Sequence, residues 1–147
     1  MKEKHKIYSK DLGINLESKK ESEYFKWFLA CLLFGKPIQQ EVAQKTYFEF
    51  IKEGLDTPDK IIKAGWKKLV KILDEGHYVR FDFSTATKLL EISKALIEKY
   101  GSLNSLFKAS KNEKDLKKRL EEFKGIGPKT TEIFLRDLRP VLYFPQV

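Results

Sequence analysis

Residues 120–135 of the chain read LEEFKGIGPKTTEIFL, two apolar helical ends joined by Gly125-Ile126-Gly127. The pattern predicts a helix-hairpin-helix. Glycine has no Cβ, so the two glycines allow backbone amides to come close to a partner's phosphates. Pro128 suits the first position of the second helix, where its missing amide hydrogen removes no hydrogen bond. Because the N-terminus of a helix favours an anion, the hairpin predicts a phosphate site.

The composition favours a polyanionic partner for that site. The 147 residues include 29 Lys and Arg against 21 Asp and Glu, which gives a formal net charge of +8. Such an excess is typical of proteins that bind nucleic acid, although a merely soluble basic protein would show the same balance. The length suits one domain. We expect it over residues 21–140, after an N-terminal extension over 1–20 and before a C-terminal tail over 141–147.

Helix start and stop signals divide most of the chain into helices. Ser, Thr or Asn precedes most apolar stretches of helical spacing, and Gly or Pro follows them. We therefore expect an all-α fold. The N-caps predicted in this way are Ser22, Thr57, Ser84, Ser102 and Asn112, with a further helix over residues 39–52 and a break at Gly65.

The segment 77–83 is a poor helix former by comparison. Its aromatic and β-branched residues alternate with Arg80 and Asp82, as they would in a half-buried strand. A lone strand, however, has no sheet to join. We therefore expect residues 77–83 to form an extended loop.

The chain has few of the Cys and His residues that bind zinc, and its 21 Asp and Glu show no motif for a metal held by carboxylates alone, which stays an open alternative. Cys31 lies in the apolar run 27–34, which predicts a buried thiol in a reducing compartment without a disulfide. His5 and His77 are far apart and have no cysteine nearby, so a zinc site is not expected. No apolar run approaches the ~20 residues of a membrane-spanning helix, and no apolar secretory segment follows the basic N-terminus. The sequence predicts a cytoplasmic protein.

The order of helices over residues 24–138 and the hairpin FKGIGPKT at 123–130 resemble the endonuclease III superfamily of DNA glycosylases, the helix-hairpin-helix-GPD group. The resemblance implies a multi-helix barrel that contains the hairpin, and a groove that receives a flipped base. It also implies a role in base excision repair, with duplex DNA, damaged or intact, bound through its backbone without sequence preference. A hairpin that serves only as a structural turn is the alternative.

The resemblance also implies which residues contact DNA. The loop 35–40 lies where related enzymes insert a polar side chain into the space left by the flipped base. The loop 75–81 lies where the family places a wedge between bases. There Tyr78 or Phe81 would stack on exposed bases for about 1 to 3 kcal/mol per base, unless Phe81 and Phe83 anchor the loop to the core. The DNA-contacting residues implied in this way are Lys36, Gln39, Gln40, Tyr78, Arg80, Lys124, Gly125, Ile126, Gly127, Lys129 and Thr130.

Lys129 is the candidate catalytic residue. Bifunctional members of the family have a lysine two residues after the second hairpin glycine, as here. A neutral amine at that place would attack the anomeric carbon of the sugar, expel the base and form a Schiff base that permits strand cleavage. The alternative is an exposed lysine that meets a phosphate.

The aspartate that accompanies this lysine in the family would fall at or beyond Val147, and residues 141–147 contain no acid. Asp137, about two turns after Lys129 on the same helix, is a weak substitute. Its neighbours Arg136 and Arg139 suggest instead a charged, solvated helix end.

Three classes of function therefore stay open. The chain is a DNA-binding protein without catalysis, a DNA glycosylase or abasic-site lyase that uses Lys129, or a non-catalytic protein-interaction module. The cluster-bearing members of the family have four closely spaced cysteines, and this chain has one, so no iron-sulfur cluster or other cofactor is expected. The sequence leaves the oligomeric state open.

Overall fold

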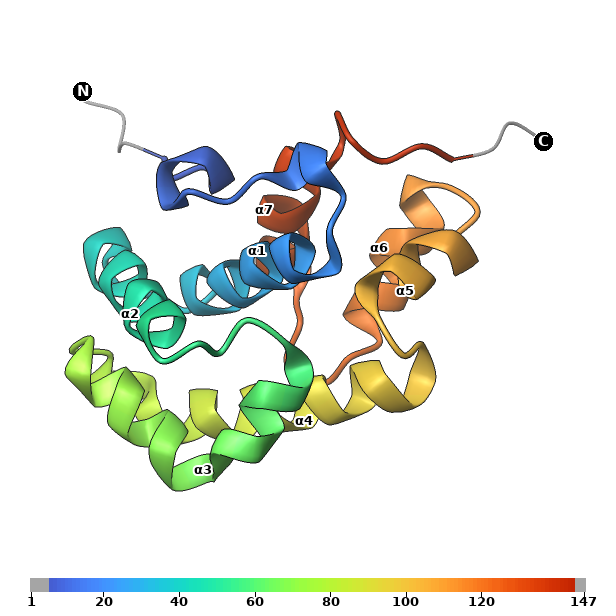
Figure 1. Ribbon diagram of the computed structural model, residues 1–147. Coiled ribbons are helices and arrows are strands. Elements are labelled where there is room, and N and C mark those ends of the chain that lie inside the picture. Colours follow the sequence, from blue (N-terminus) through green and yellow to red (C-terminus); the bar gives the residue numbers. More distant parts are fainter. Residues whose placement is uncertain (1–5, 145–147) are drawn as a thin grey trace.

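The regular secondary structure in the computed structural model, which describes residues 6–144, consists of helices (Figure 1). No strand occurs in that range, so the expected all-α class is confirmed. His5 and residues 145–147 lie outside the described residues. The α-helices are α1 (Glu21–Phe34), α2 (Gln40–Lys52), α3 (Pro58–Glu75), α4 (Asp82–Lys99), α5 (Leu103–Ala109), α6 (Glu113–Glu121) and α7 (Pro128–Leu138), and the 3-10 helices are η1 (Ser9–Leu12), η2 (Leu16–Ser18) and η3 (Val79–Phe81).

The helix α1 runs through the middle of the molecule (Figure 1). A helix that is apolar on every side is stable only when it is surrounded, and every residue from 27 to 34 is buried. Cys31 is among them, as expected, and burial raises the pKa of its thiol well above the usual value. The indole Nε1 of Trp27 donates to the carbonyl of Phe134 at 3.1 Å, which fixes α7 against α1.

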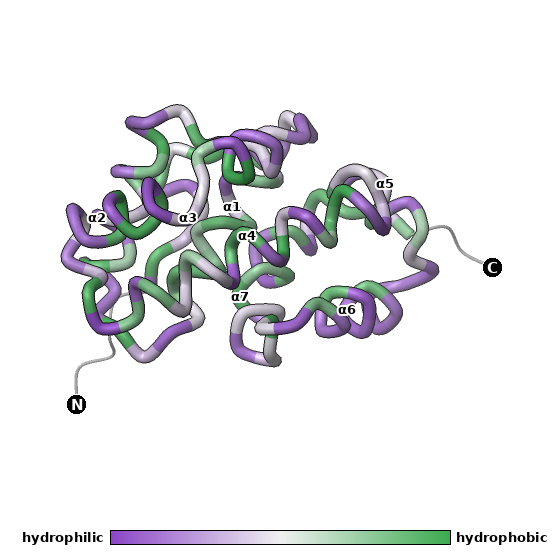
Figure 2. Tube along the Cα trace, turned by 90° about the horizontal axis from the view of Figure 1, so that it is seen from below, coloured by the Kyte–Doolittle hydropathy of each residue, from purple (hydrophilic) through white to green (hydrophobic). Residues whose placement is uncertain are grey.

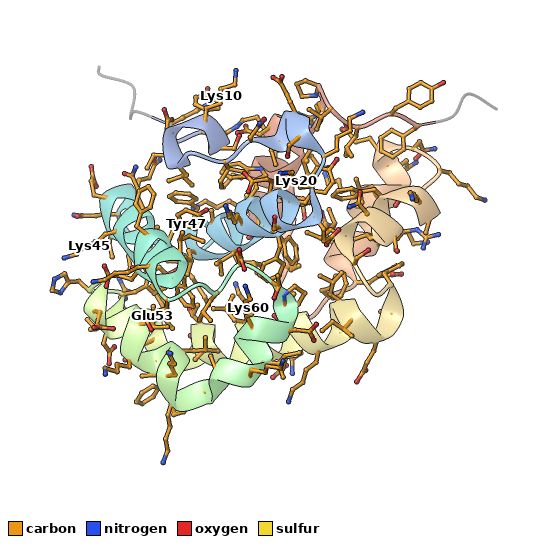
Figure 3. All side chains as sticks on the ribbon, in the orientation of Figure 1. Lys10, Lys20, Lys45, Tyr47, Glu53 and Lys60 are labelled. Carbon is orange, nitrogen blue, oxygen red and sulfur yellow. The ribbon has the colours of Figure 1, made fainter. Side chains whose placement is uncertain are left out.

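The helices α3 and α4 lie side by side along one edge of the molecule, opposite the two ends of the described chain (Figures 1 and 2). Gly65 interrupts α3 with a φ of 81°, a value that glycine adopts readily, so the break expected there is confirmed. The helix α2 packs on α1, and the buried ring of Tyr47 lies between them (Figure 3). By contrast α6 is hydrophilic along most of its length (Figure 2).

Three of the expected N-caps are confirmed and two are wrong. Thr57, Ser102 and Asn112 each accept a hydrogen bond from the backbone amide three residues later. Ser22 and Ser84 lie inside their helices, which begin at Glu21 and Asp82. Carboxylates stand in the first turn of both helices, where they interact favourably with the helix dipole without capping it.

The segment 77–83 is not extended as expected, because residues 79–81 form a 3-10 turn. The cause is Tyr78, whose ring is fully buried and whose hydroxyl donates to the backbone carbonyl of Leu33. Phe81 is half-buried, whereas Phe83 is 60% exposed and does not anchor the segment.

The N-terminal segment is part of the same core, so residue 20 is not a boundary in the packing. Leu12, Ile14 and Leu16 are buried together with the residues of α1. At the other end, residues 141, 142 and 144 pack against the core and are partly buried. No helix within residues 6–144 combines the length and the apolar character that a membrane span requires.

Candidate nucleic-acid interface

The turn between α6 and α7, residues 122–127, is held in place by two apolar side chains. Phe123 and Ile126 are buried, and the amide of Ile126 donates to the carbonyl of Phe123 at 3.1 Å. Between them Lys124 and Gly125 are exposed. The sequence FKGI therefore produces a tight turn that presents Lys124 and Gly125 to solvent.

The two glycines of this turn have different surroundings. Gly125 has a φ of 96°, and a Cβ there would lie 2.7 Å from Cδ of Lys88 on α4. The fold itself therefore requires glycine at position 125. Gly127 has a φ of −107°, which any residue adopts, and apart from its two chain neighbours no heavy atom of the described chain lies within 4 Å of the place its Cβ would take. The packing of the described residues therefore does not account for glycine at position 127.

That open space lies at the N-terminus of α7. Gly127 is the N-cap and provides no side chain to cap the helix, and Pro128 is the first helical residue. The amides of Lys129 and Thr130 come in the first turn, where a helix has no acceptors of its own. That turn also contains no acidic residue. These amides and the helix dipole point at the space in front of Gly127 and favour an anion there.

Four lysines from different parts of the chain surround this region. Lys124 and Lys129 are exposed on either side of Gly127 in the sequence. The stem of Lys88 packs against Gly125, and Lys36 stands close enough to Lys88 to affect its titration. Burial, together with the charge of Lys36, lowers the pKa of Lys88 to about 8. The Lys88 ammonium is therefore destabilised in the free protein, and a bound anion would relieve this.

The loops that sequence analysis assigned to DNA binding lie close to this turn. A Cβ at Gly35 would overlap Oγ1 of Thr130, so the loop after α1 lies directly against the start of α7. The Nζ atom of Lys36 lies 5.2 Å from the centre of the Phe81 ring, and the guanidinium of Arg80 lies at the same distance. The turn and the two loops therefore lie on neighbouring parts of the molecule.

Not every residue in the predicted set can contact DNA through its side chain. The prediction for Tyr78 is wrong, because its ring is fully buried and burial raises the pKa of its hydroxyl. Ile126 and Thr130 are also buried, so they offer only backbone groups. Gln39 and Arg80 are exposed. Gln40 is half-buried, and its Oε1 atom has no hydrogen-bond partner among the described residues.

Asp137 is not placed to assist Lys129. Its carboxylate accepts from the backbone amide of Ser9 at 2.7 Å and from Nε of Arg136 at the same distance. Only 8% of its side chain is exposed, so the expected solvated helix end is wrong for this residue. Asp137 fixes the N-terminal segment to the C-terminal end of α7, whereas Lys129 lies at the other end of the helix.

Lys88 and the exposed pair Trp66 and Phe83 are not in the predicted set of DNA-contacting residues. Nothing distinguishes Lys88 from the many lysines on solvated helix faces until the fold places it against Gly125. Trp66, the first residue after the break at Gly65, is 38% exposed. Within residues 6–144 the structure holds no cluster of three or more His, Cys, Asp or Glu that could bind a metal.

Comparisons with models of protein families, with curated proteins and with solved structures gave no match for this chain. Function is therefore inferred from the geometry of the turn and its surroundings.

Proposed function

We propose that the chain is a DNA-binding protein of the helix-hairpin-helix type, with the multi-helix barrel of the endonuclease III superfamily, and that it acts in DNA repair. The α6–α7 turn, residues 122–127, is the hairpin, and α7 is its second helix. The observation that carries the proposal is the open space at Gly127, which lies in front of an uncapped helix N-terminus. A phosphate oxygen fits the donors that face this space.

The charges around the turn support a polyanion as the ligand. Lys124 and Lys129 lie on either side of Gly127 in the sequence and are exposed, the stem of Lys88 packs against Gly125, and Lys36 lies near Lys88. Over the whole chain the formal net charge is +8. A long polyanion is attracted both by the site at the helix N-terminus and by the net positive charge of the chain. A small anion is attracted mainly by the site at the helix N-terminus.

The proposed contacts do not read the base sequence. Backbone amides and lysines bind phosphates, which are the same at every base pair. We therefore expect duplexes of unrelated sequence to bind with equal affinity, and expect binding to weaken as salt is added.

Fluorescence anisotropy of labelled duplexes tests this proposal. Gly127→Glu places a carboxylate in the space meant for a phosphate, so we expect its affinity to fall by at least about tenfold, an electrostatic cost of roughly 1.4 kcal/mol. Lys45→Gln is the matched control, because it lowers the net charge by the same amount on the outer side of α2 (Figure 3). Equal binding by Gly127→Glu and the wild type would refute the proposal.

The lyase alternative has less support, because Asp137 is bound to Ser9 and Arg136. Borohydride trapping on an abasic-site duplex tests it directly. A covalent adduct with the wild type that is lost in Lys129→Gln would establish Lys129 as a Schiff-base nucleophile. Without such an adduct the chain is a binding protein or a glycosylase that does not use a lysine, and a base-release assay separates these two.

A further inference from the structure

The surroundings of Lys88 favour the neutral form of its amine. Its stem packs against Gly125, so the side chain is half-buried between α4 and the turn. Burial first and the charge of Lys36 second lower the pKa of Lys88 to about 8. Among residues 6–144 it forms no ion pair that would hold its proton. Since the neutral amine is the nucleophile, Lys88 is chemically distinct from an ordinary lysine.

Lys88 also lines a groove of about 450 Å³ between α4 and the turn, a volume in the range of small-ligand sites. One wall is a single face of α4, since Ser84, Thr87, Lys88 and Glu91 follow the helical period. The opposite wall is the exposed tip of the turn, which includes Lys124. A small molecule can therefore reach Lys88 from solvent although the side chain is half-buried.

The charges around Lys88 determine which kind of reagent the groove would hold. Lys124 stands in the opposite wall, and Lys36 lies near Lys88 from the loop after α1. Glu91 is the acidic residue of the lining. Two cations beside one nucleophilic amine favour an electrophile with an anionic leaving group, because they bind that group and stabilise the charge that develops on it.

We propose that Lys88 is a modification site, at which the side-chain amine takes up the acyl group of an acyl phosphate whose phosphate group lies at Lys124. The amine nitrogen attacks the carbonyl carbon and forms a C–N bond, and the C–O bond to the phosphate breaks. The phosphate leaves with the electron pair of that bond and takes up the proton that the amine loses. The product is an uncharged amide at position 88 and free inorganic phosphate.

The modification would weaken the proposed binding of DNA, because it removes one of the positive charges near the hairpin. Lys88→Gln has the neutral charge of the acylated residue. We expect it to reduce the slope of log affinity for duplex DNA against log salt concentration by about 1. This consequence rests on the proposed function, whereas the modification itself does not.

Reaction of the full chain with acetyl phosphate, followed by peptide mass spectrometry, measures the rate of acetylation at each lysine. At pH 7 a pKa of about 8 gives a neutral fraction more than about a hundred times that of an ordinary lysine, and the weaker basicity offsets part of this gain. We therefore expect Lys88 to react at least about fivefold faster than the exposed Lys45. The rate at Lys88 should level off above about pH 8, where most of its amine is neutral.

Lys124→Gln separates the binding of the phosphate from the reactivity of the amine. Lys124 is exposed, and thermal unfolding verifies that the variant folds. We expect acetylation of Lys88 by acetyl phosphate to slow in this variant, and acetylation by p-nitrophenyl acetate, an uncharged acyl donor, to stay at the wild-type rate.

Two results would overturn the modification site. One is reaction of Lys88 no faster than Lys45, and the other is an unchanged rate with acetyl phosphate in Lys124→Gln. Both leave the proposed function standing, because the binding of duplex DNA is measured on the unmodified chain. Fast, selective acetylation of a chain that binds no duplex would support the modification site and refute the proposed function.

Discussion

Gly125 and Gly127 are two residues apart in one turn, yet the packing of the described residues explains the need for glycine only at position 125. Gly125→Ala would combine a left-handed backbone with a contact of 2.7 Å to the Lys88 stem. We expect it to lower the free energy of unfolding by about 1 to 3 kcal/mol.

Gly127→Ala is the matched variant, since it adds the same methyl group where the backbone and the space accept it. We expect its free energy of unfolding to stay within about 0.5 kcal/mol of the wild type. Urea denaturation of both variants measures the difference. Equal losses would show that the open space at Gly127 is needed for folding and not for a ligand.

Lys88 is a residue whose charge opposes folding. Lys88→Met keeps an apolar stem against Gly125 and removes the buried charge, so we expect stability at pH 7 to rise by on the order of 1 kcal/mol. The same variant is expected to bind duplex DNA more weakly, because it has lost a partner for phosphate. A loss of stability in Lys88→Met, or a gain in stability with unchanged binding to duplex DNA, would contradict the proposed role of Lys88.

The pH dependence of stability gives a second check on Lys88. Its pKa is about 8 in the folded chain, against 10.5 for an ordinary lysine. Between these values the unfolded chain holds the proton and the folded chain has released it, so the contribution of Lys88 to stability rises with pH in this window. We expect the stability gain of Lys88→Met to shrink as the pH rises from about 8 to 10.5. If the stability gain of Lys88→Met did not change with pH, the charge of Lys88 would not be the cause of that gain.

At the scale of elements, α7 has separate roles at its two ends. Its C-terminal end fixes the N-terminal segment through Asp137, which accepts from the amide of Ser9. We expect Asp137→Ala to lose about 1 to 3 kcal/mol of stability and to speed hydrogen exchange at Ser9, with duplex binding unchanged. Glu132→Ala, which removes a surface ion pair with Arg139, is the control and should change little. A loss of DNA binding in Asp137→Ala without a loss of stability would reopen its role as a partner of Lys129.

Helices and their caps were predictable from the sequence where the signal is local. Thr57, Ser102 and Asn112 cap the helices that follow them, and Pro128 begins α7 as expected. The predictions failed where a distant contact decides the structure. Glu21 shows this, because it begins α1 and its carboxylate also accepts from the amides of Leu103 and Asn104 at the start of α5.

The same distinction applies to the candidate site. The turn at residues 122–127 follows from its own glycines and apolar anchors, so its place could be read from the sequence. The burial of Tyr78 could not, because it depends on a hydrogen bond to Leu33, 45 residues earlier. Lys88 was missed for a similar reason, since only the fold brings it to Gly125.

At the scale of the whole molecule, the number of phosphates that the chain contacts sets the salt dependence. The lysines near the hairpin are Lys36, Lys88, Lys124 and Lys129. If each meets a phosphate, the logarithm of the duplex affinity should fall with the logarithm of the salt concentration with a slope of roughly −3 to −4, at about 0.9 per phosphate. Lys129→Gln should reduce the slope by about 1, and Lys45→Gln should not. A slope near zero would contradict a backbone-binding surface.

The most direct test of the central claim is amide chemical-shift mapping by NMR with duplex DNA. We expect the largest shifts at the amides of Gly127, Lys129 and Thr130, where the uncapped end of α7 meets a phosphate. Smaller shifts should follow at Lys124 and around Lys88. Shifts that leave these amides unchanged and follow another surface, such as the hydrophilic helix α6, would contradict it.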